Sequence, residues 1–374
     1  MKFIVSAIEE IIKDYKGSPP LNLFLKTYFK SKPKLGSRDR KAITDAVYAY
    51  YRLERFIQNP ETQLWLMLSW AIQQNIISNA IIEKIIPSNL NEKLDFNWEI
   101  FSPDFFSEGI QNQEWSASIL KQAKTFIRIR KGYRLKVLAF LSQEQIAFSE
   151  ISDNILSFEN GVKLQQFLPQ EAYVIQDYSS QRSLDILRNV IQKDAAFNVW
   201  DVCSGAGGKT ILFKDLFPNA SILCTDIRST ILFNLRERVK LYGIKNIKTQ
   251  VLDISKANAQ NAIAQNFDIV ITDVPCSGSG TWSRTPEQLY FFNIEKIRSF
   301  HELQTEIIFN ASQKVKPGAY LNYITCSVFK EENEEVIKKF LTRNQDFQLV
   351  EQLLINGIPD QADCMFVAVL RKKE

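Results

Sequence analysis

Acidic side chains that could bind one ligand follow four predicted β-strands in the second half of this 374-residue chain. Asp201, Asp226, Asp253 and Asp273 each end a run rich in hydrophobic residues. Because the carboxyl ends of parallel strands meet at one edge of an open α/β sheet, we expect all four to face the same crevice. Four carboxylates there disfavour a triphosphate and favour a ligand that is cationic at sulfur. Asp226 suits two ribose hydroxyls, and Asp253 suits an adenine amino group.

A glycine-rich loop, DVCSGAGGKT at residues 201–210, connects the first of these strands to a predicted helix. A phosphate-binding P-loop requires glycine where this chain has Cys203, and a dinucleotide-binding loop requires glycine where it has Thr210. We therefore predict that the loop binds S-adenosylmethionine. The residues predicted to bind this cofactor are Cys203, Ser204, Gly205, Ala206, Gly207, Gly208, Lys209, Asp226, Asp253 and Asp273.

Two of the five cysteines follow strands that open into the same predicted crevice. Cys276 lies in DVPCSGSG and Cys326 lies in YITCSVFKEENEEV. A thiol in such a place can be activated by nearby positive charge, such as that of Lys209. The structural alternatives are a tight turn for Cys276 and a buried strand end for Cys326. An odd number of cysteines, no CxxC pair and one histidine predict neither a disulfide framework nor a metal site.

Three segments of different periodicity must position these residues. Residues 1–119 are predicted to be all-helical, with Ser37 as the N-cap of the helix SRDRKAITDAVYAYYRLERFI. Residues 120–170 predict a small α+β module with strands in FIRIR, NILSF and VKLQQF. In residues 171–374 strands alternate with helices, which predicts a doubly wound α/β domain with a parallel sheet covered on both faces.

Basic residues gather in two parts of the chain, whose net charge is only +4. Residues 1–58 hold twelve Lys and Arg against six Asp and Glu, and residues 121–136 hold seven basic residues and no acidic one. With Phe126 and Tyr133 interleaved, the second run suits a nucleic-acid backbone with exposed bases, and a solvated surface is the open alternative. No apolar run is long enough to span a membrane, and the first residues do not form a signal peptide, so we expect a cytoplasmic protein.

The chain resembles the RsmB/Sun family of RNA cytosine-5 methyltransferases over nearly its whole length. The resemblance lies in the motifs QDYSSQ, DVCSGAGGKT, TDIR, VLD, DVPCSGSG, KPGAYLNYITCS and KEENEEV, together with Gln304. It implies a NusB-like RNA-binding domain at 1–119, a ferredoxin- or RRM-like module at 120–170 and a Rossmann-like, S-adenosylmethionine-dependent methyltransferase domain at 171–374. The family usually has Ala-Ala-Pro where this chain has Ser204, Gly205 and Ala206.

The resemblance also implies a chemistry for the two thiols. C5 of cytosine is a poor nucleophile until a thiolate adds to C6, and Cys326 would be that nucleophile. Cys276 would assist release of the methylated RNA, Asp273 would hydrogen-bond the base, and Lys209 would tune the charge of the cluster. The target cytosine must be unpaired or flipped out to reach the crevice.

The NusB-like resemblance implies ribosomal RNA, in particular 16S RNA, as the substrate. We also expect a monomer that needs no metal. Two alternatives stay open. One is methylation of transfer RNA by the same chemistry, and the other is an RNA-binding or ribosome-assembly factor with an inactive catalytic domain.

Overall fold

The computed structural model describes residues 2–59, 63–86, 93–192 and 196–374. The chain forms two compact units. The first consists of Met1–Pro103, Gln111–Gln122 and Thr281–Ile294, and the second of Asp104–Ile110, Ala123–Gly280 and Glu295–Glu374. The predicted domains 1–119, 120–170 and 171–374 stay a prediction, and the undescribed residues fall within the first and third of these ranges.

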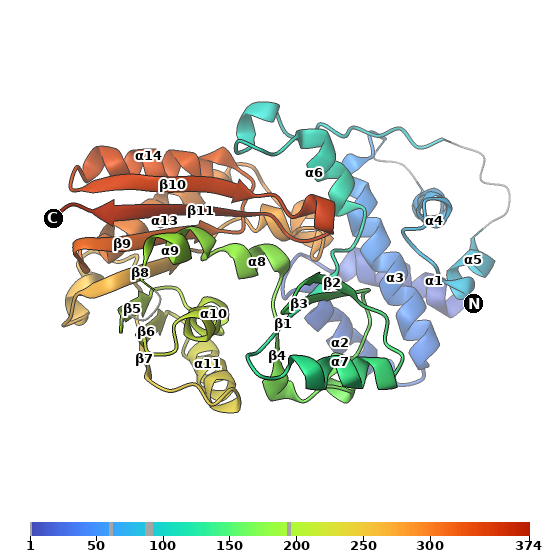
Figure 1. Cartoon of the computed structure of the whole chain (residues 1–374). Helices are drawn as coiled ribbons and strands as arrows, with labels where there is room; N and C mark the ends of the chain where they lie inside the picture. Colours follow the sequence, from blue (N-terminus) through green and yellow to red (C-terminus); the bar gives the residue numbers. More distant parts are fainter. Residues whose placement is uncertain (1, 60–62, 87–92, 193–195) are drawn as a thin grey trace. The chain divides into compact units, whose positions relative to one another are not determined.

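The first unit is built from helices, as predicted for the N-terminal part of the chain. They are α1 (Lys2–Asp14), α2 (Leu21–Ser31), α3 (Ser37–Leu53), α4 (Leu64–Gln73), α5 (Ala80–Ile85), α6 (Asn112–Ile119) and α12 (Pro286–Tyr290) (Figure 1). Helix α3 contacts α1, α4, α5 and α12, and its Ile43 and Val47 are fully buried. Although α12 comes from much later in the sequence, its Tyr290 packs edge-on against Tyr51 of α3.

Helix α3 begins one residue away from the predicted cap. Gly36 is the N-cap, and its backbone N–H donates to Asp39 Oδ2 at 3.2 Å. Ser37, the predicted N-cap, is therefore the first helical residue. The prediction was wrong because the Asp39 carboxylate reaches back to the backbone and supplies the capping interaction itself.

The second unit contains a small antiparallel sheet of order β2-β3-β1-β4. Its strands are β1 (Thr125–Ile129), β2 (Ser149–Ser152), β3 (Ile155–Phe158) and β4 (Tyr173–Ile175), and helix α7 (Arg134–Gln143) follows β1. The strand predicted in VKLQQF is wrong, since Leu164–Gln166 is a turn of 3₁₀ helix. Leu164 and Leu168 are both buried, and the Leu168 N–H donates to the Leu164 carbonyl at 2.8 Å, so their spacing is helical.

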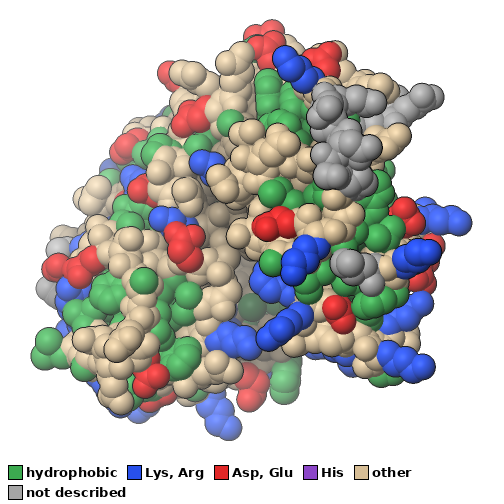
Figure 2. All heavy atoms as spheres, turned by 90° about the vertical axis from the view of Figure 1, so that its right-hand side faces the viewer, with side chains coloured by type: hydrophobic (Ala, Val, Ile, Leu, Met, Phe, Trp, Pro, Cys, Tyr) green, Lys and Arg blue, Asp and Glu red, His purple; other side chains and the backbone are tan. Residues whose placement is uncertain are grey.

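The basic run at 121–136 is not wholly exposed. Phe126, predicted as an exposed stacking residue, is 1% exposed and stacks on Tyr178. Arg128 and Arg130 both form ion pairs with Asp215. These side chains therefore stabilise the second unit rather than face RNA. On the face shown in Figure 2, Lys and Arg side chains gather in places but alternate with acidic and hydrophobic ones.

The second unit also holds a seven-stranded sheet of order β10-β11-β9-β8-β5-β6-β7. The strands are β5 (Asn198–Asp201), β6 (Ser221–Asp226), β7 (Ile247–Val251), β8 (Phe267–Asp273), β9 (Val315–Thr325), β10 (Phe347–Ile355) and β11 (Met365–Lys372). Strands β5 to β9 are parallel, as predicted, but β11 runs antiparallel to both β9 and β10. The short connection from β10 to β11 has no room for the crossover helix that a parallel pair requires.

Hydrophobic cores cover both faces of this sheet, which confirms the doubly wound, Rossmann-like fold. The helices are α8 (Tyr178–Arg182), α9 (Asp185–Val190), α10 (Gly208–Leu216), α11 (Ser229–Leu241), α13 (Lys296–Ser312) and α14 (Glu334–Arg343). Val199 of β5 joins the core formed with α10 and α11, whereas Trp200, the next residue, joins the core formed with α13 and α14. This alternation is the two-residue period of a strand buried on both faces.

Within the described ranges, no helix has both the length and the apolar character that crossing a membrane requires.

Candidate active site

Open space lies beside Gly205, in the loop between β5 and α10, and beside Gly208, the first residue of α10. Gly205 and Gly207 have φ angles of 53° and 84°, in the left-handed region that favours glycine. A Cβ at Gly207 would lie 3.0 Å from Leu235 Cγ, whereas a Cβ at Gly205 or Gly208 would meet no atom within 4 Å. Gly207 therefore serves the close packing of α10 on α11, and the other two glycines leave room for a ligand.

A cavity of about 580 Å³ opens beside this loop. Most of the predicted site residues line it: Cys203, Ser204, Gly205, Ala206, Gly208, Asp226, Asp253, Asp273, Cys276 and Cys326. The apolar part of the lining comes from Val202, Ile227, Leu252, Ile254, Val274, Pro275, Leu303 and Ile307. Gly207 and Lys209, which were also predicted, are not among the lining residues. The cavity therefore combines carboxylates, small residues and thiols with apolar walls.

Asp226, at the end of β6, is held in one orientation by several donors. Its Oδ2 accepts from the Gly205 N–H at 3.0 Å, and the Arg228 backbone N–H and guanidinium donate to the same carboxylate at 2.9–3.1 Å. Burial acts to raise the pKa of Asp226, but the Arg228 hydrogen bonds outweigh it and hold the pKa below its usual value. Asp253 instead accepts from the backbone N–H and hydroxyl of Ser255 at 3.2 and 2.6 Å.

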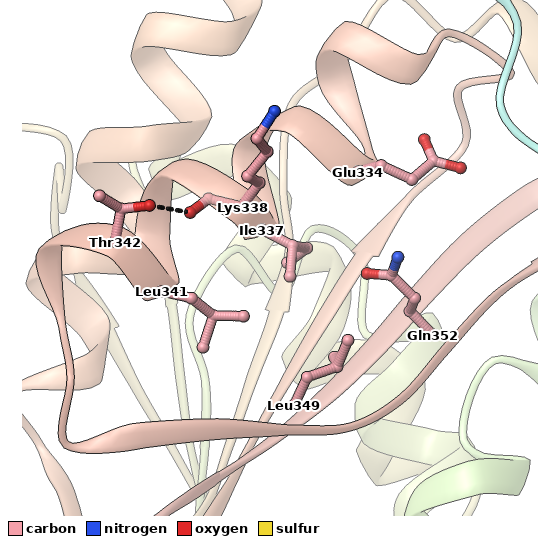
Figure 3. Close-up of a pocket in the computed structure, with 7 residues that line it drawn as sticks. All are labelled: Glu334, Ile337, Lys338, Leu341, Thr342, Leu349 and Gln352. Carbon is pink, nitrogen blue, oxygen red and sulfur yellow. Dashed lines mark hydrogen bonds between the residues drawn. The ribbon is translucent and has the colours of Figure 1, made fainter.

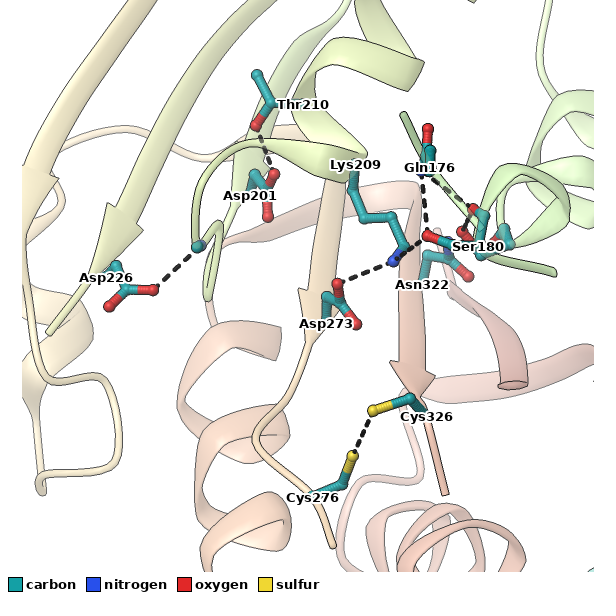
Figure 4. Close-up of polar contacts among 12 residues, drawn as sticks. Gln176, Ser180, Asp201, Lys209, Thr210, Asp226, Asp273, Cys276, Asn322 and Cys326 are labelled. Atoms are coloured by element: carbon teal, nitrogen blue, oxygen red, sulfur yellow. Dashed lines mark hydrogen bonds and ion pairs between the residues drawn. The ribbon is translucent and has the colours of Figure 1, made fainter. Parts of the chain in front are cut away.

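Asp201 does not face the cavity as expected. Its side chain is fully buried, and its Oδ2 accepts from the Thr210 hydroxyl at 2.5 Å (Figure 4). Burial raises the pKa of this carboxyl to about 7, and the negative charge of Asp273 acts in the same direction. The expectation was wrong because Thr210, in the first turn of α10, draws the carboxyl beneath the loop rather than into the crevice.

Lys209 connects the end of β8 to helix α8, which precedes the large sheet in the sequence. Its Nζ donates to Asp273 Oδ2 and to Ser180 Oγ, both at 3.0 Å (Figure 4). Gln176 Nε2 donates to the same hydroxyl at 3.1 Å, and Arg128 Nη2 donates to Gln176 Oε1 at 3.5 Å. The Lys209 side chain is 7% exposed, so its ammonium is paired in a largely buried place. A chain of hydrogen bonds thus connects the small sheet to Asp273.

The two predicted thiols lie side by side. Cys276 Sγ and Cys326 Sγ are 3.2 Å apart, and Figure 4 shows them facing each other. They come together because β8 and β9 are neighbours and their ends pair in register, Asp273 with Ile324. The Gly280 N–H also donates to the Cys326 carbonyl at 2.9 Å. The hydrogen bond with Cys326, burial and nearby negative charge raise the pKa of Cys276.

A buried carboxyl group lies next to both thiol-bearing loops. Glu332 is 0% exposed and accepts from the backbone N–H and hydroxyl of Ser277, the hydroxyl of Ser327 and Nε2 of Gln304. These bonds are 2.5–3.0 Å long. Burial raises the pKa of Glu332, and the hydrogen bonds act against that rise.

Three of these site residues were not predicted: Arg228, Ser180 and Glu332. Each stands in a motif already noted, TDIR, QDYSSQ or KEENEEV, so its presence near the site had a sequence signal. No sequence signal indicated the roles of Ser180 and Glu332. Ser180 contacts Lys209, 29 residues away in the chain, and Glu332 contacts Ser277, 55 residues away.

A second hollow, of about 410 Å³, lies between α14 and β10 and holds none of the predicted residues. It is lined by Glu334, Ile337, Lys338, Leu341, Thr342, Leu349 and Gln352 (Figure 3). The chemistry-bearing groups are therefore gathered in the first cavity.

Comparisons with known proteins agree with this geometry. Residues 189–370 match the family described as 16S rRNA methyltransferase RsmB/F. Ribosomal RNA small subunit methyltransferase B of Salmonella paratyphi A is 35% identical over 164 residues, which are 44% of this chain and 37% of that protein. The relative from Salmonella enteritidis has the same identity and coverage. The match thus spans little more than a third of the length of these curated relatives.

Solved structures share the fold. PH0851 aligns with a TM-score of 0.70 at 21% identity and covers 99% of this chain and 97% of its own. NSun6 from Pyrococcus horikoshii, solved with SFG, aligns with a TM-score of 0.60 at 16% identity over 73% of this chain and 100% of its own. At these identities the likeness concerns the fold alone.

Proposed function

Residues 189–370 belong to the RsmB/F family of S-adenosylmethionine-dependent methyltransferases, and from this premise we propose that the chain methylates C5 of a cytosine in RNA. The observation that carries the proposal is the pair of thiols, 3.2 Å apart, in the lining of a cavity that begins at a glycine loop. A methyltransferase that acts on an amino nitrogen has no use for two cysteines at adjacent strand ends.

The residues of the cavity fit S-adenosylmethionine. Open space beside Gly205 and Gly208 leaves room for the methionine part, and Asp226, held ionised by Arg228, presents a carboxylate of the kind that accepts ribose hydroxyls. Ile227 and Leu252 offer apolar surface for a purine ring. When bound, the cofactor supplies an electrophilic methyl group on a sulfonium.

The protein's own groups divide the remaining work. We assign Cys326 as the nucleophile that adds to C6 of cytosine, so that electron density reaches C5. After methyl transfer, removal of the C5 proton restores the C5–C6 double bond and expels the Cys326 thiolate, and Cys276 assists this release of the methylated product. Asp273, whose carboxylate is oriented by Lys209, accepts a hydrogen bond from the amino edge of the base and so orients the base for attack.

Two cysteine variants test these roles on the full chain with cellular RNA and labelled cofactor. Cys326→Ala should abolish methyl transfer, and Cys276→Ala should accumulate a covalent RNA adduct that shifts on a denaturing gel. Cys364→Ala removes a buried thiol that does not line the cavity and is the control, which should keep its activity. Full activity in Cys326→Ala, together with no adduct in Cys276→Ala, would refute the assignment.

We further propose that the substrate is 16S ribosomal RNA. The names of the curated relatives support this choice, since each is a ribosomal RNA small subunit methyltransferase. Bisulfite sequencing of total RNA with and without the gene should reveal one lost 5-methylcytosine in ribosomal RNA. A lost site in transfer RNA would favour the first alternative, and no loss in any RNA would favour an inactive assembly factor. A cytoplasmic location and a monomeric state belong to the same proposal.

A further inference from the structure

One buried carboxyl group touches the residues that follow both thiols. Glu332 Oε1 accepts from the Ser277 N–H at 2.7 Å, and Glu332 Oε2 accepts from the hydroxyls of Ser277 and Ser327, each at 2.5 Å. Ser277 comes directly after Cys276, and Ser327 directly after Cys326. A single side chain therefore joins the two loops that carry the thiols.

The bonding pattern indicates that Glu332 is ionised. Its partners are one backbone N–H, two hydroxyls and the Gln304 amide, at 2.5–3.0 Å, and all of them can donate. A carboxylate is an acceptor at both oxygens, so four donors match the charged form. None of these four partners carries a positive charge. The negative charge of Glu332 is therefore solvated by neutral dipoles and acts on its surroundings.

That charge acts on the Cys276 thiol. The pKa of Cys276 is raised by its hydrogen bond with Cys326, by burial, by the charge of Cys326 and by the charge of Glu332. A thiolate at Cys276 would thus stand near a fixed anion. Two cysteines in contact cannot both ionise readily. Glu332 accepts from the N–H of the peptide bond that joins Cys276 to Ser277, whereas it meets the Cys326 side through the Ser327 hydroxyl, so its charge acts more directly on Cys276.

We propose that Glu332 is a positioning residue that holds the two thiols together and keeps Cys276 protonated, so that Cys326 is the one that becomes the thiolate. The ordering of the two thiols is a property of the protein alone. Its meaning for catalysis, that the nucleophile and the assisting thiol are kept distinct, rests on the proposed function.

The test measures the alkylation of each cysteine by iodoacetamide in the full chain, without RNA or cofactor. Peptide mass spectrometry gives the rate for Cys276 and Cys326 separately between about pH 6 and pH 10. In the unaltered protein Cys326 should react at lower pH than Cys276. If Cys276 reacts at the same pH as Cys326 or at a lower pH, the proposal is overturned. This measurement uses the unaltered protein, so it does not depend on the folding of a variant.

Glu332→Gln removes the charge and keeps the shape. Its Cys276 profile should move to lower pH, and the ratio of the Cys326 rate to the Cys276 rate should fall by about tenfold, which corresponds to a shift of about one pKa unit between the two thiols. Glu335→Gln is the matched control, since Glu335 stands in the same segment and pairs with Lys338 at the surface. An unchanged ratio in folded Glu332→Gln would overturn the proposal.

The outcomes separate this inference from the proposed function. Because alkylation needs neither substrate nor cofactor, an absence of methyl transfer would leave the thiol measurement intact. Conversely, if the protein is an active methyltransferase but the ratio of the two alkylation rates is the same with and without the Glu332 charge, this inference alone would be refuted.

Discussion

Two adjacent glycines at the start of α10, the N-cap Gly207 and the first helical residue Gly208, should change stability in opposite directions when replaced by alanine. Gly208 is the first residue of α10, has no positive φ, and a Cβ there would meet no atom within 4 Å. Gly208→Ala should therefore stabilise the cofactor-free protein by about 0.4–1 kcal/mol, because alanine restricts the unfolded chain more than glycine does. The midpoint of thermal unfolding should rise by about 1–2 °C.

Gly207→Ala should destabilise the protein. Its φ of 84° costs an alanine about 1–2 kcal/mol, and its Cβ would press on Leu235 Cγ at 3.0 Å. The unfolding midpoint should fall by about 2–4 °C. The comparison is sharp because the two substitutions add the same methyl group at neighbouring positions.

The same methyl group at Gly208 should weaken cofactor binding while it stabilises the protein. The open space beside Gly208 belongs to the cavity that we assign to S-adenosylmethionine. Overpacking a close-fitting site costs about 1–3 kcal/mol, which is about a five- to 150-fold loss of affinity. Calorimetric titration of the folded variant measures this loss. A Gly208→Ala protein that is more stable and binds the cofactor as tightly as before would refute the placement of the ligand.

Three further predictions concern other parts of the site. Gly280→Ala should destabilise the protein by about 1–3 kcal/mol in urea denaturation, because its Cβ would lie 2.1 Å from a backbone carbonyl oxygen; an unchanged midpoint would contradict this close approach. Ser180→Ala removes a partner of Lys209 and should slow methyl transfer by about three- to tenfold. Ser179→Ala, which removes a buried hydroxyl that has no partner within the described residues, should not slow it, and equal rates in both variants would count against the role of Ser180. Because burial raises the pKa of Asp201 to about 7, above its unfolded value, the folded state holds an extra proton and stability should decline as pH rises from about 4 to about 7. Asp201→Asn should remove that decline, and a variant that loses stability in parallel with the unaltered protein would contradict it.

Most of the catalytic fold could be predicted from local patterns. Strands buried on both faces read as short apolar runs, and the acidic residues and cysteines that end them share one edge of a parallel sheet. That rule places Asp226, Asp273, Cys276 and Cys326 in one cavity, as the structure does. The antiparallel β11 was missed because strand direction follows from the length of a connection rather than from the composition of the strand.

The remaining errors share a cause. Phe126 lies in a basic run, yet its ring is buried against Tyr178, and Arg128 in the same run pairs with Asp215. Asp201 ends a strand like the other acids, but Thr210 draws it beneath the loop. Residue type and spacing describe what a side chain can do, and its partners depend on which distant segments pack beside it.

The class of chemistry could be predicted from the chain alone, because a glycine loop, strand-end acids and two strand-end thiols follow from short-range order and from the geometry of parallel sheets. The hydrogen bonds and charges that tune these groups depend on tertiary packing. Lys209 meets Ser180 across 29 residues, and Glu332 meets Ser277 across 55. Such contacts form when packing brings separate loops within 3 Å, and the free energy of that packing is spread over cores of many residues. No short pattern in the chain encodes it.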